Sequence, residues 1–169
     1  MPQQTQSVKV ANADDFRKGM RRLAAAVNVI STDVDGELHG LLATAVCSVS
    51  AEPPTLLICI NKDATACAPI AASKRFCVNV LSQKQFTLAQ EFLTLKSSER
   101  LSLCSWQRLA TGAPVIDGAL ASFDCEVAQV VDAGTHTIYF GKVMAVALSE
   151  ADAPLLYFGG GYAELAQPT

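Results

Sequence analysis

The chain has 169 residues, of which 50% are hydrophobic and 17% are charged, and its formal net charge is −3. This length and apolar content suit one globular domain with a sizeable core and leave no room for two. An acidic chain without a basic run offers no broad attraction to nucleic acid or to anionic lipid. The composition therefore argues against nucleic-acid and membrane roles.

The start of the sequence and its cysteines bear on where the protein resides. The first residues lack the basic flank and apolar stretch of a secretory signal, and no later segment stays apolar for the thickness of a bilayer, so we expect a cytoplasmic protein. Residues 1–12 are polar and predict a flexible tail before one domain over 13–166.

Scattered cysteines without C-x-x-C spacing predict reduced core thiols, and two histidines give no recognisable metal site. The cysteines are Cys47, Cys59, Cys67, Cys77, Cys104 and Cys125.

The first half of the chain changes from a helical to an extended pattern. Apolar residues recur at helical spacing after a capping residue, either Asn12 or Asp14. β-Branched and apolar residues follow, and the pair Asp35-Gly36 is a turn signal between two such runs. Together these patterns predict a helix that ends near residue 25 and a β-hairpin with strands at 27–32 and 38–50.

The second half is again mostly extended. Pro53 and Pro54 remove two backbone donors and end the long strand before them. We expect strands at 55–61, 76–82 and 155–158, two long β patterns within 119–148, and helices at 66–73 and 83–93, while 94–113 shows no clear pattern. Many strands with turns between neighbours favour an antiparallel barrel over a doubly wound sheet. No G-x-G-x-x-G opens a helix, so a Rossmann dinucleotide site is not supported.

One strand carries hydroxyl side chains at even spacing. Thr44, Ser48 and Ser50 would share one face of an extended strand from 38 to 50. The small residues between them would let a flat ligand approach the backbone. A hydroxyl ladder on a half-exposed strand is the commoner explanation of such a pattern.

Polar residues also gather where strands begin or end. Asn61, Lys62 and Thr65 follow a strand, where a turn can present an amide, an ammonium and a hydroxyl to a phosphate, or can simply be solvated. His136 opens a later strand and could stand at a barrel rim, where an imidazole donates a hydrogen bond or stacks on a ring. A lone histidine is more often structural, and the sequence offers no spacing that predicts a Ser-His-Asp or Cys-His pair.

Seven blocks of the sequence, read together, resemble the flavin reductase family with the FMN-binding split barrel. The blocks are RRLAAAVNVIST (21–32), GLLATAVCSVSAEPPTLLICIN (40–61), FCVNVLS (76–82), ERLSLCSW (99–106), GALASFDCEV (118–127), GTHTIYFGKV (134–143) and PLLYFGGGY (154–162). They are most similar to reductase components of two-component aromatic monooxygenases, such as 4-hydroxyphenylacetate and chlorophenol hydroxylases. The resemblance implies a mainly β, Greek-key antiparallel barrel with a few helices. It also implies a homodimer with flavin sites near the subunit interface.

The resemblance also implies a role for each candidate site residue. The flavin cradle falls on Thr44, Ala45, Val46, Ser48, Val49 and Ser50, and Asn61, Lys62 and Thr65 close around the ribityl chain and phosphate. His136 falls near the nicotinamide as the catalytic residue, Tyr157 and Gly159 line the same pocket, and Arg100 is a further candidate for the phosphate. Lys62, Asp63 and Thr65 depart from the Arg and Ser that the family often shows, and Asp63 places a carboxylate beside the anion site.

The implied function is hydride transfer from NADH or NADPH to FMN or FAD. Reduced flavin would then pass to a partner oxygenase, so flavin binding should be modest. One alternative is a split barrel that stores or senses flavin without oxidising NADH. Another is a protein similar to pyridoxamine-phosphate oxidase, but that class needs several basic residues for the substrate phosphate, and this chain offers few.

Overall fold

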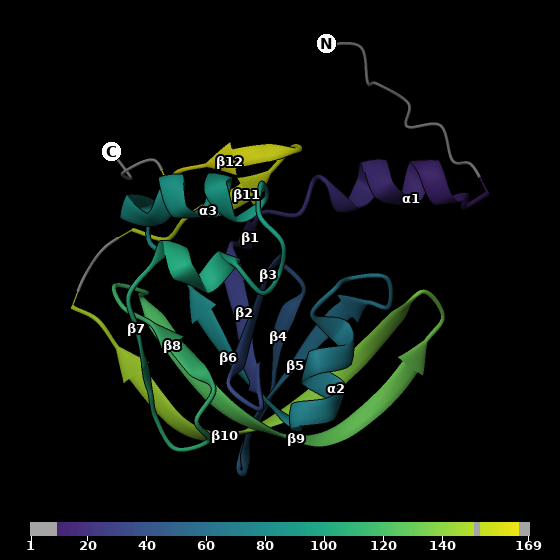
Figure 1. Ribbon diagram of the computed structural model, residues 1–169. Coiled ribbons are helices and arrows are strands. Elements are labelled where there is room, and N and C mark those ends of the chain that lie inside the picture. The colour runs from purple at the N-terminus through teal and green to yellow at the C-terminus, as the bar shows by residue number, and fades with distance from the viewer. Residues whose placement is uncertain (1–9, 151–152, 166–169) are drawn as a thin grey trace.

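The computed structural model describes residues 10–150 and 153–165 as a mainly β protein (Figure 1). Its strands are β1 (Ala25–Ala26), β2 (Asn28–Val34), β3 (Glu37–Ala43), β4 (Val46–Ala51), β5 (Pro54–Asn61), β6 (Arg75–Val80), β7 (Trp106–Arg108), β8 (Pro114–Ile116), β9 (Ala121–Ala133), β10 (His136–Leu148), β11 (Leu156–Phe158) and β12 (Gly161–Ala163). The α-helices are α1 (Ala13–Met20), α2 (Cys67–Ser73) and α3 (Phe86–Phe92), and the 3-10 turns are η1 (Gln83–Gln85) and η2 (Arg100–Leu103). Most of the predicted flexible tail, residues 1–9, lies outside the described residues.

A seven-stranded antiparallel sheet, in the order β3-β2-β6-β9-β10-β5-β4, forms the body of the molecule. Its edge strands β3 and β4 are consecutive in the chain and are joined only by Thr44 and Ala45. Three Cα-to-Cα steps span at most about 11 Å, so the two edges must come this close where the linker crosses. The sheet therefore curls almost into a barrel, and within the described residues β3 and β4 do not pair. The mainly β, antiparallel prediction is confirmed, with the barrel left open at this seam.

Two predicted boundaries differ from the structure. Helix α1 ends at Met20 instead of near residue 25, because the amides of Arg22 and Leu23 bond to carbonyls only three residues back and Ala25 is taken into a strand pair with Tyr157. The single strand predicted over 38–50 is two strands on opposite edges of the sheet. The apolar run continues through the linker, so periodicity alone did not reveal the break.

Strand β2, which lies next to the edge strand β3, is buried on both faces. Its Ile30 belongs to a core cluster inside the curled sheet, with Ile58, Phe76 and Tyr139, while Val29 belongs to a second cluster under α3 that includes Phe92. Successive side chains of a strand point to opposite faces, so one strand contributes to both clusters. Figure 1 shows α3 and the β11-β12 hairpin covering one end of the sheet, whereas α1 projects beyond the body.

The six cysteines are free thiols, but they are not all core residues. Cys67, Cys77 and Cys125 are buried, as predicted, and burial together with nearby Asp124 raises the pKa of Cys125 to about 12. Cys47 is exposed on edge strand β4, which corrects the prediction for that residue. Cys59 and Cys104 are half-buried.

No helix in the described part of the chain is long and apolar enough to cross a membrane.

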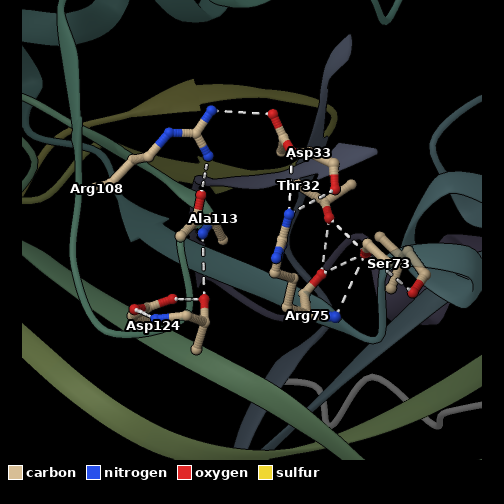
Figure 2. Close-up of polar contacts among 10 residues, drawn as sticks. Thr32, Asp33, Ser73, Arg75, Arg108, Ala113 and Asp124 are labelled. Carbon is tan, nitrogen blue, oxygen red and sulfur yellow. Dashed lines mark hydrogen bonds and ion pairs between the residues drawn. The ribbon is translucent and has the colours of Figure 1, made fainter. Parts of the chain in front are cut away.

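A polar network fastens the end of β2 that lies away from the seam (Figure 2). The Asp33 side chain is only 6% exposed, and its two carboxylate oxygens each lie 3.0 Å from a guanidinium, one of Arg75 and one of Arg108. The Thr32 hydroxyl donates to the Arg75 carbonyl at 2.8 Å. Burial alone would raise the pKa of Asp33, but the hydrogen bond and charge of Arg108, helped by Arg75, outweigh it and hold this pKa below its ordinary value. The network thus ties β2, β6 and β7 together.

We predict that Asp33→Asn lowers the free energy of unfolding at pH 7 by about 1–3 kcal/mol, the range for losing hydrogen bonds to charged partners. A lowered carboxyl pKa stabilises the fold above the unfolded-state value and ceases to do so as the pH falls through the folded-state value. Urea unfolding should therefore separate the variant from the parent at pH 7, and the difference should shrink as the pH falls below the ordinary pKa of aspartate. The exposed Asp132, changed to Asn, is the matched control and should unfold like the parent. Equal urea midpoints for Asp33→Asn and the parent at pH 7 would contradict this role.

Candidate active site

Four of the predicted site residues, Thr44, Ala45, Asn61 and His136, meet at the seam between β3 and β4. The Asn28 side chain is buried and donates to the carbonyls of Ala26 and Ala43 at 3.0 and 3.1 Å, which fixes the last residue before the linker. At the second linker residue, the Ala45 carbonyl accepts a hydrogen bond from the Cys59 amide at 3.0 Å, which holds the linker on β5. Two strands hold the linker in place from opposite sides.

The strand register brings residues that are distant in the sequence to the seam. In the β5-β10 pair, Asn61 stands opposite His136, while β5 also pairs with β4. A cavity of about 300 Å³, the seam cavity, is lined here by Ala43, Thr44, Ala45, Cys59, Asn61 and His136. His136 is half-buried, and its Nδ1 lies 2.9 Å from the Thr135 hydroxyl, which leaves Nε2 as the ring nitrogen for a ligand. The cavity thus combines an imidazole, an amide and a hydroxyl beside exposed backbone.

The expected flavin cradle is divided in two. Thr44 and Ala45 line the seam cavity, whereas Val46, Ser48 and Ser50 line a separate, mostly apolar cavity of about 260 Å³ on β4. This corrects the prediction that Thr44 shares one strand face with the two serines.

A register shift also interrupts β4. Ser48 pairs with Leu56 and Ser50 with Thr55, so Val49 is the extra residue of a bulge and is 47% exposed. The Ser50 hydroxyl serves the backbone, because it donates to the Glu52 carbonyl at 3.0 Å and accepts from the Glu52 amide at 3.1 Å. The Ser48 hydroxyl, in contrast, has no protein partner within hydrogen-bond distance among the described residues.

The turn after β5 carries a cation, Lys62, next in sequence to Asn61, which lines the seam cavity. The Asn61 side-chain oxygen accepts the Asp63 amide at 3.0 Å and shapes the turn, and Thr65 is exposed just before α2. Lys62 Nζ lies 2.6 Å from Asp132 Oδ2, and this bond holds the pKa of Asp132 below its ordinary value. The carboxylate that competes for Lys62 is therefore Asp132, from the β9-β10 hairpin. Sequence analysis had suggested Asp63, its neighbour.

Arg100 and the C-terminal block take other places. The Arg100 guanidinium donates to the carbonyls of Leu95 and Gly40 at 3.0 and 2.9 Å, and burial lowers its pKa. Arg100 therefore ties β3 to the segment after α3. It is not among the described residues that line the seam cavity. Gly159 has φ of 66° in the turn from β11 to β12, and its amide donates to the Arg21 carbonyl. Tyr157, expected beside His136, lines an adjoining cavity instead.

This adjoining cavity includes residues that sequence reasoning missed. Tyr162 lies edge to face with Tyr157, with ring centroids 6.1 Å apart, and Leu93 follows α3 at the same opening. The cavity shares Ala43 and Thr44 with the seam cavity. The only sequence signal for Tyr162 was its position at the end of the PLLYFGGGY block.

The curled antiparallel sheet that stays open at one seam has the architecture of a split barrel. Residues 20–166 match the flavin reductase like domain, and the chain belongs to this family. The resemblance seen in the sequence is thereby confirmed, and the protein is a flavin reductase.

Relatives and solved structures agree with this assignment. The chain is 43% identical over 150 residues to the FMN reductase (NADH) RutF of Stutzerimonas stutzeri A1501, covering 88% of this chain and 86% of that one. It superimposes on the flavin reductase PheA2 with a TM-score of 0.82 at 36% identity, covering 93% and 100% of the two chains. The NADH:FAD oxidoreductase SgcE6 of Streptomyces globisporus C-1027, solved with NAD and FAD fragments, gives 0.84 at 28% identity, covering 94% and 98%. BorF, the reductase component of a bacterial two-component tryptophan halogenase, gives 0.83 at 28% identity, covering 93% and 100%.

Proposed function

We propose that this flavin reductase transfers a hydride from NADH to FMN at the seam cavity and releases reduced flavin to an oxygenase. The observation that carries the proposal is the register that sets His136 opposite Asn61, beside the exposed Thr44-Ala45 linker. When bound, the nicotinamide and the flavin supply the redox chemistry. The chain supplies position and a surface that displaces water, which is the larger part of such catalysis.

Each group in the site has a proposed task. β4 is an edge strand, so one side of its backbone is free to bond the edge of a flavin ring, and Ser48 adds a hydroxyl. Asn61, Lys62 and Thr65 would hold the ribityl chain and phosphate at the turn after β5. His136 would steady the nicotinamide through Nε2, while Thr135 orients its ring.

The choice of FMN and NADH rests on relatives. The similar RutF proteins are named FMN reductase (NADH), and their identity to this chain reaches 43%. The SgcE6 structure, at 28% identity, holds NAD and FAD fragments, so FAD is the second acceptor to test. A flavin-storing protein without NADH oxidation is the alternative of another class.

The proposed partner is an oxygenase that consumes reduced flavin. BorF is the reductase component of a two-component halogenase, which supports this class of partner. Thr44 and Ala45 are exposed, so a flavin bound at the linker could leave without movement of the core. The resemblance in the sequence points to an aromatic hydroxylase as the particular oxygenase, and this narrower assignment remains part of the proposal.

A homodimer is the proposed assembly. Helix α1 buries none of its residues, and Phe16 and Met20 are 64% and 47% exposed. A helix of eight residues is marginal in water unless its apolar face is covered. A second copy would cover α1 and the exposed face of β4, and a two-fold axis would use the same patch on both subunits.

We expect anaerobic addition of NADH to bleach FMN absorbance in near-stoichiometric amounts. In His136→Ala, the KM for NADH should rise or the rate of hydride transfer should fall, because the proposed contact is with the nicotinamide. FMN affinity, measured by fluorescence quenching, should stay within a few fold of the parent.

Two results would contradict this assignment. Flavin binding without reduction by NADH or NADPH would favour the storage protein. A collapse of FMN affinity in a folded His136→Ala variant would place the imidazole at the flavin.

Lys62→Ala should weaken FMN binding by about one to two decades, since a charge-assisted contact contributes roughly 1.5–3 kcal/mol. Riboflavin, which lacks the phosphate, should bind almost as before. Asp132→Asn is the matched variant, because it frees the Lys62 ammonium and should strengthen FMN binding relative to riboflavin. Equal changes for FMN and riboflavin in both variants would remove Lys62 from the phosphate site.

Sedimentation velocity at low micromolar concentration should show a dimer, and Phe16→Asp should shift it toward monomer, because the new carboxylate would be buried at the interface. Met20→Leu, which keeps that face apolar, is the control and should remain dimeric. A parent protein that sediments only as a monomer would refute the dimer.

A further inference from the structure

Asn28 is a buried polar residue at the start of β2, on the same face of the strand as the core residue Ile30. Its side chain is almost completely enclosed, because the residue is only 3% exposed. A buried amide costs free energy unless it is hydrogen-bonded. The Asn28 amide donates to the carbonyls of Ala26, in β1, and Ala43, the last residue of β3. This one side chain therefore joins two strands beside the seam.

Hydrogen bonds occupy three consecutive carbonyls at the linker, those of residues 43–45. Asn28 bonds the first of them at 3.1 Å. The backbone amides of Val46 and Cys59 donate to the second and the third, each at 3.0 Å. Asn28 is the only one of these three donors that is a side chain, so a substitution can remove its bond and leave the backbone donors in place.

The amides of the linker, in contrast, are free. Those of Thr44 and Ala45 have no acceptor among the described residues, and both residues are exposed. In a planar trans peptide, the C=O and the N–H point in opposite directions. Because Asn28 holds the Ala43 carbonyl, the N–H of Thr44 must point away from Asn28. A free N–H is the donor that a carbonyl or ring nitrogen at the edge of a flavin requires.

We infer that Asn28 is a positioning residue for the flavin. It fixes the peptide between Ala43 and Thr44, so that the Thr44 amide is presented to the flavin ring. This inference rests on the proposed function, because it takes the linker as the flavin site. Asn28 would act only through this peptide, since it is not among the described residues that line the seam cavity. Its effect should therefore fall on the flavin ring, whereas that of Lys62 should fall on the phosphate.

Steady-state kinetics with two flavins test this assignment. Asn28→Ala and Asn28→Leu both remove the donor, the first by truncation and the second with a bulky apolar side chain. In each variant, the KM for FMN and the KM for riboflavin should rise by the same factor, about three- to tenfold, as expected for the loss of one hydrogen bond. The KM for NADH should stay within twofold of the parent, because the nicotinamide is assigned to His136.

Asp33→Asn is the matched control for a loss of stability. It removes bonds at the other end of the same strand, far from the linker. Its KM values for FMN, riboflavin and NADH should match those of the parent although its free energy of unfolding falls. A purely structural role of Asn28 would lower the amount of active enzyme, and with it the apparent kcat, without raising the KM for flavin alone.

Hydrogen exchange in the flavin-free protein tests the linker independently of catalysis. The amides of Val46 and Cys59 donate to the linker carbonyls, so their exchange, followed by NMR, reports how firmly the linker is held. In Asn28→Ala, both amides should exchange at least about threefold faster than in the parent. In Asp33→Asn, they should exchange at the parent rate.

These measurements separate a failure of the inference from a failure of the proposed function. If the parent binds flavin but does not reduce it, the proposed function fails, and fluorescence titration decides the inference: Asn28→Ala should weaken FMN and riboflavin binding equally. A parent that binds no flavin would overturn both.

Four results would overturn the inference alone. One is an unchanged KM for both flavins in folded Asn28→Ala and Asn28→Leu. Another is a rise for FMN without riboflavin, which would locate the effect at the phosphate. A third is an equal rise for NADH, which would make the effect of Asn28 a general one. The fourth is parent-like exchange at Val46 and Cys59 in Asn28→Ala, which would show that the linker keeps its position without this side chain.

Discussion

The two-residue link between β3 and β4 is the constraint on which the rest of this structure depends. It joins strands at opposite edges of a seven-stranded sheet, so the sheet can form only if it curls until those edges meet. The two edges meet at this link without pairing in the described part of the chain, and Thr44 and Ala45 cross between them. An open seam with exposed backbone, next to a buried core, is the result. Thr44 lines both the seam cavity and the adjoining cavity of Tyr157 and Tyr162.

Antiparallel register completes the site from distant parts of the chain. The short Gly134 turn sets the β9-β10 register, so Asp132 of β9 stands opposite Thr137 of β10. The same end of this hairpin therefore carries both His136 and Asp132, the partner of Lys62. The same β10 pairs with β5 and sets His136 against Asn61. A slip of one residue would turn His136 to the other face of the sheet. The core on the inner face of β10, where Tyr139 is buried, opposes such a slip and so fixes the position of His136.

The sequence predicted those features that short stretches of residues determine. Alternation, turn residues and prolines predicted most strands and α2, and the resemblance predicted His136, Asn61 and Thr44 as neighbours. It did not predict the break at Thr44, because apolar and small residues continue unchanged through the linker. Nor did it predict the pairing of Lys62 with Asp132, which lie 70 residues apart and meet only through the hairpin register. Arg100 matched a family block, yet its guanidinium binds two main-chain carbonyls, an arrangement that a block of sequence does not encode.

The two ends of β2 make different contacts. At one end, Asn28 bonds to Ala43 beside the linker, and at the other, Asp33 binds two arginines. Four residues lie between Asn28 and Asp33, which are about 17 Å apart along the strand, and one of the four is the fully buried Ile30. Charge at the Asp33 end is neutralised within the protein, whereas Thr44 and Ala45 at the seam end stay exposed. Bonds at both ends of β2 therefore hold the strand, and with it Ala43, in place without covering the linker.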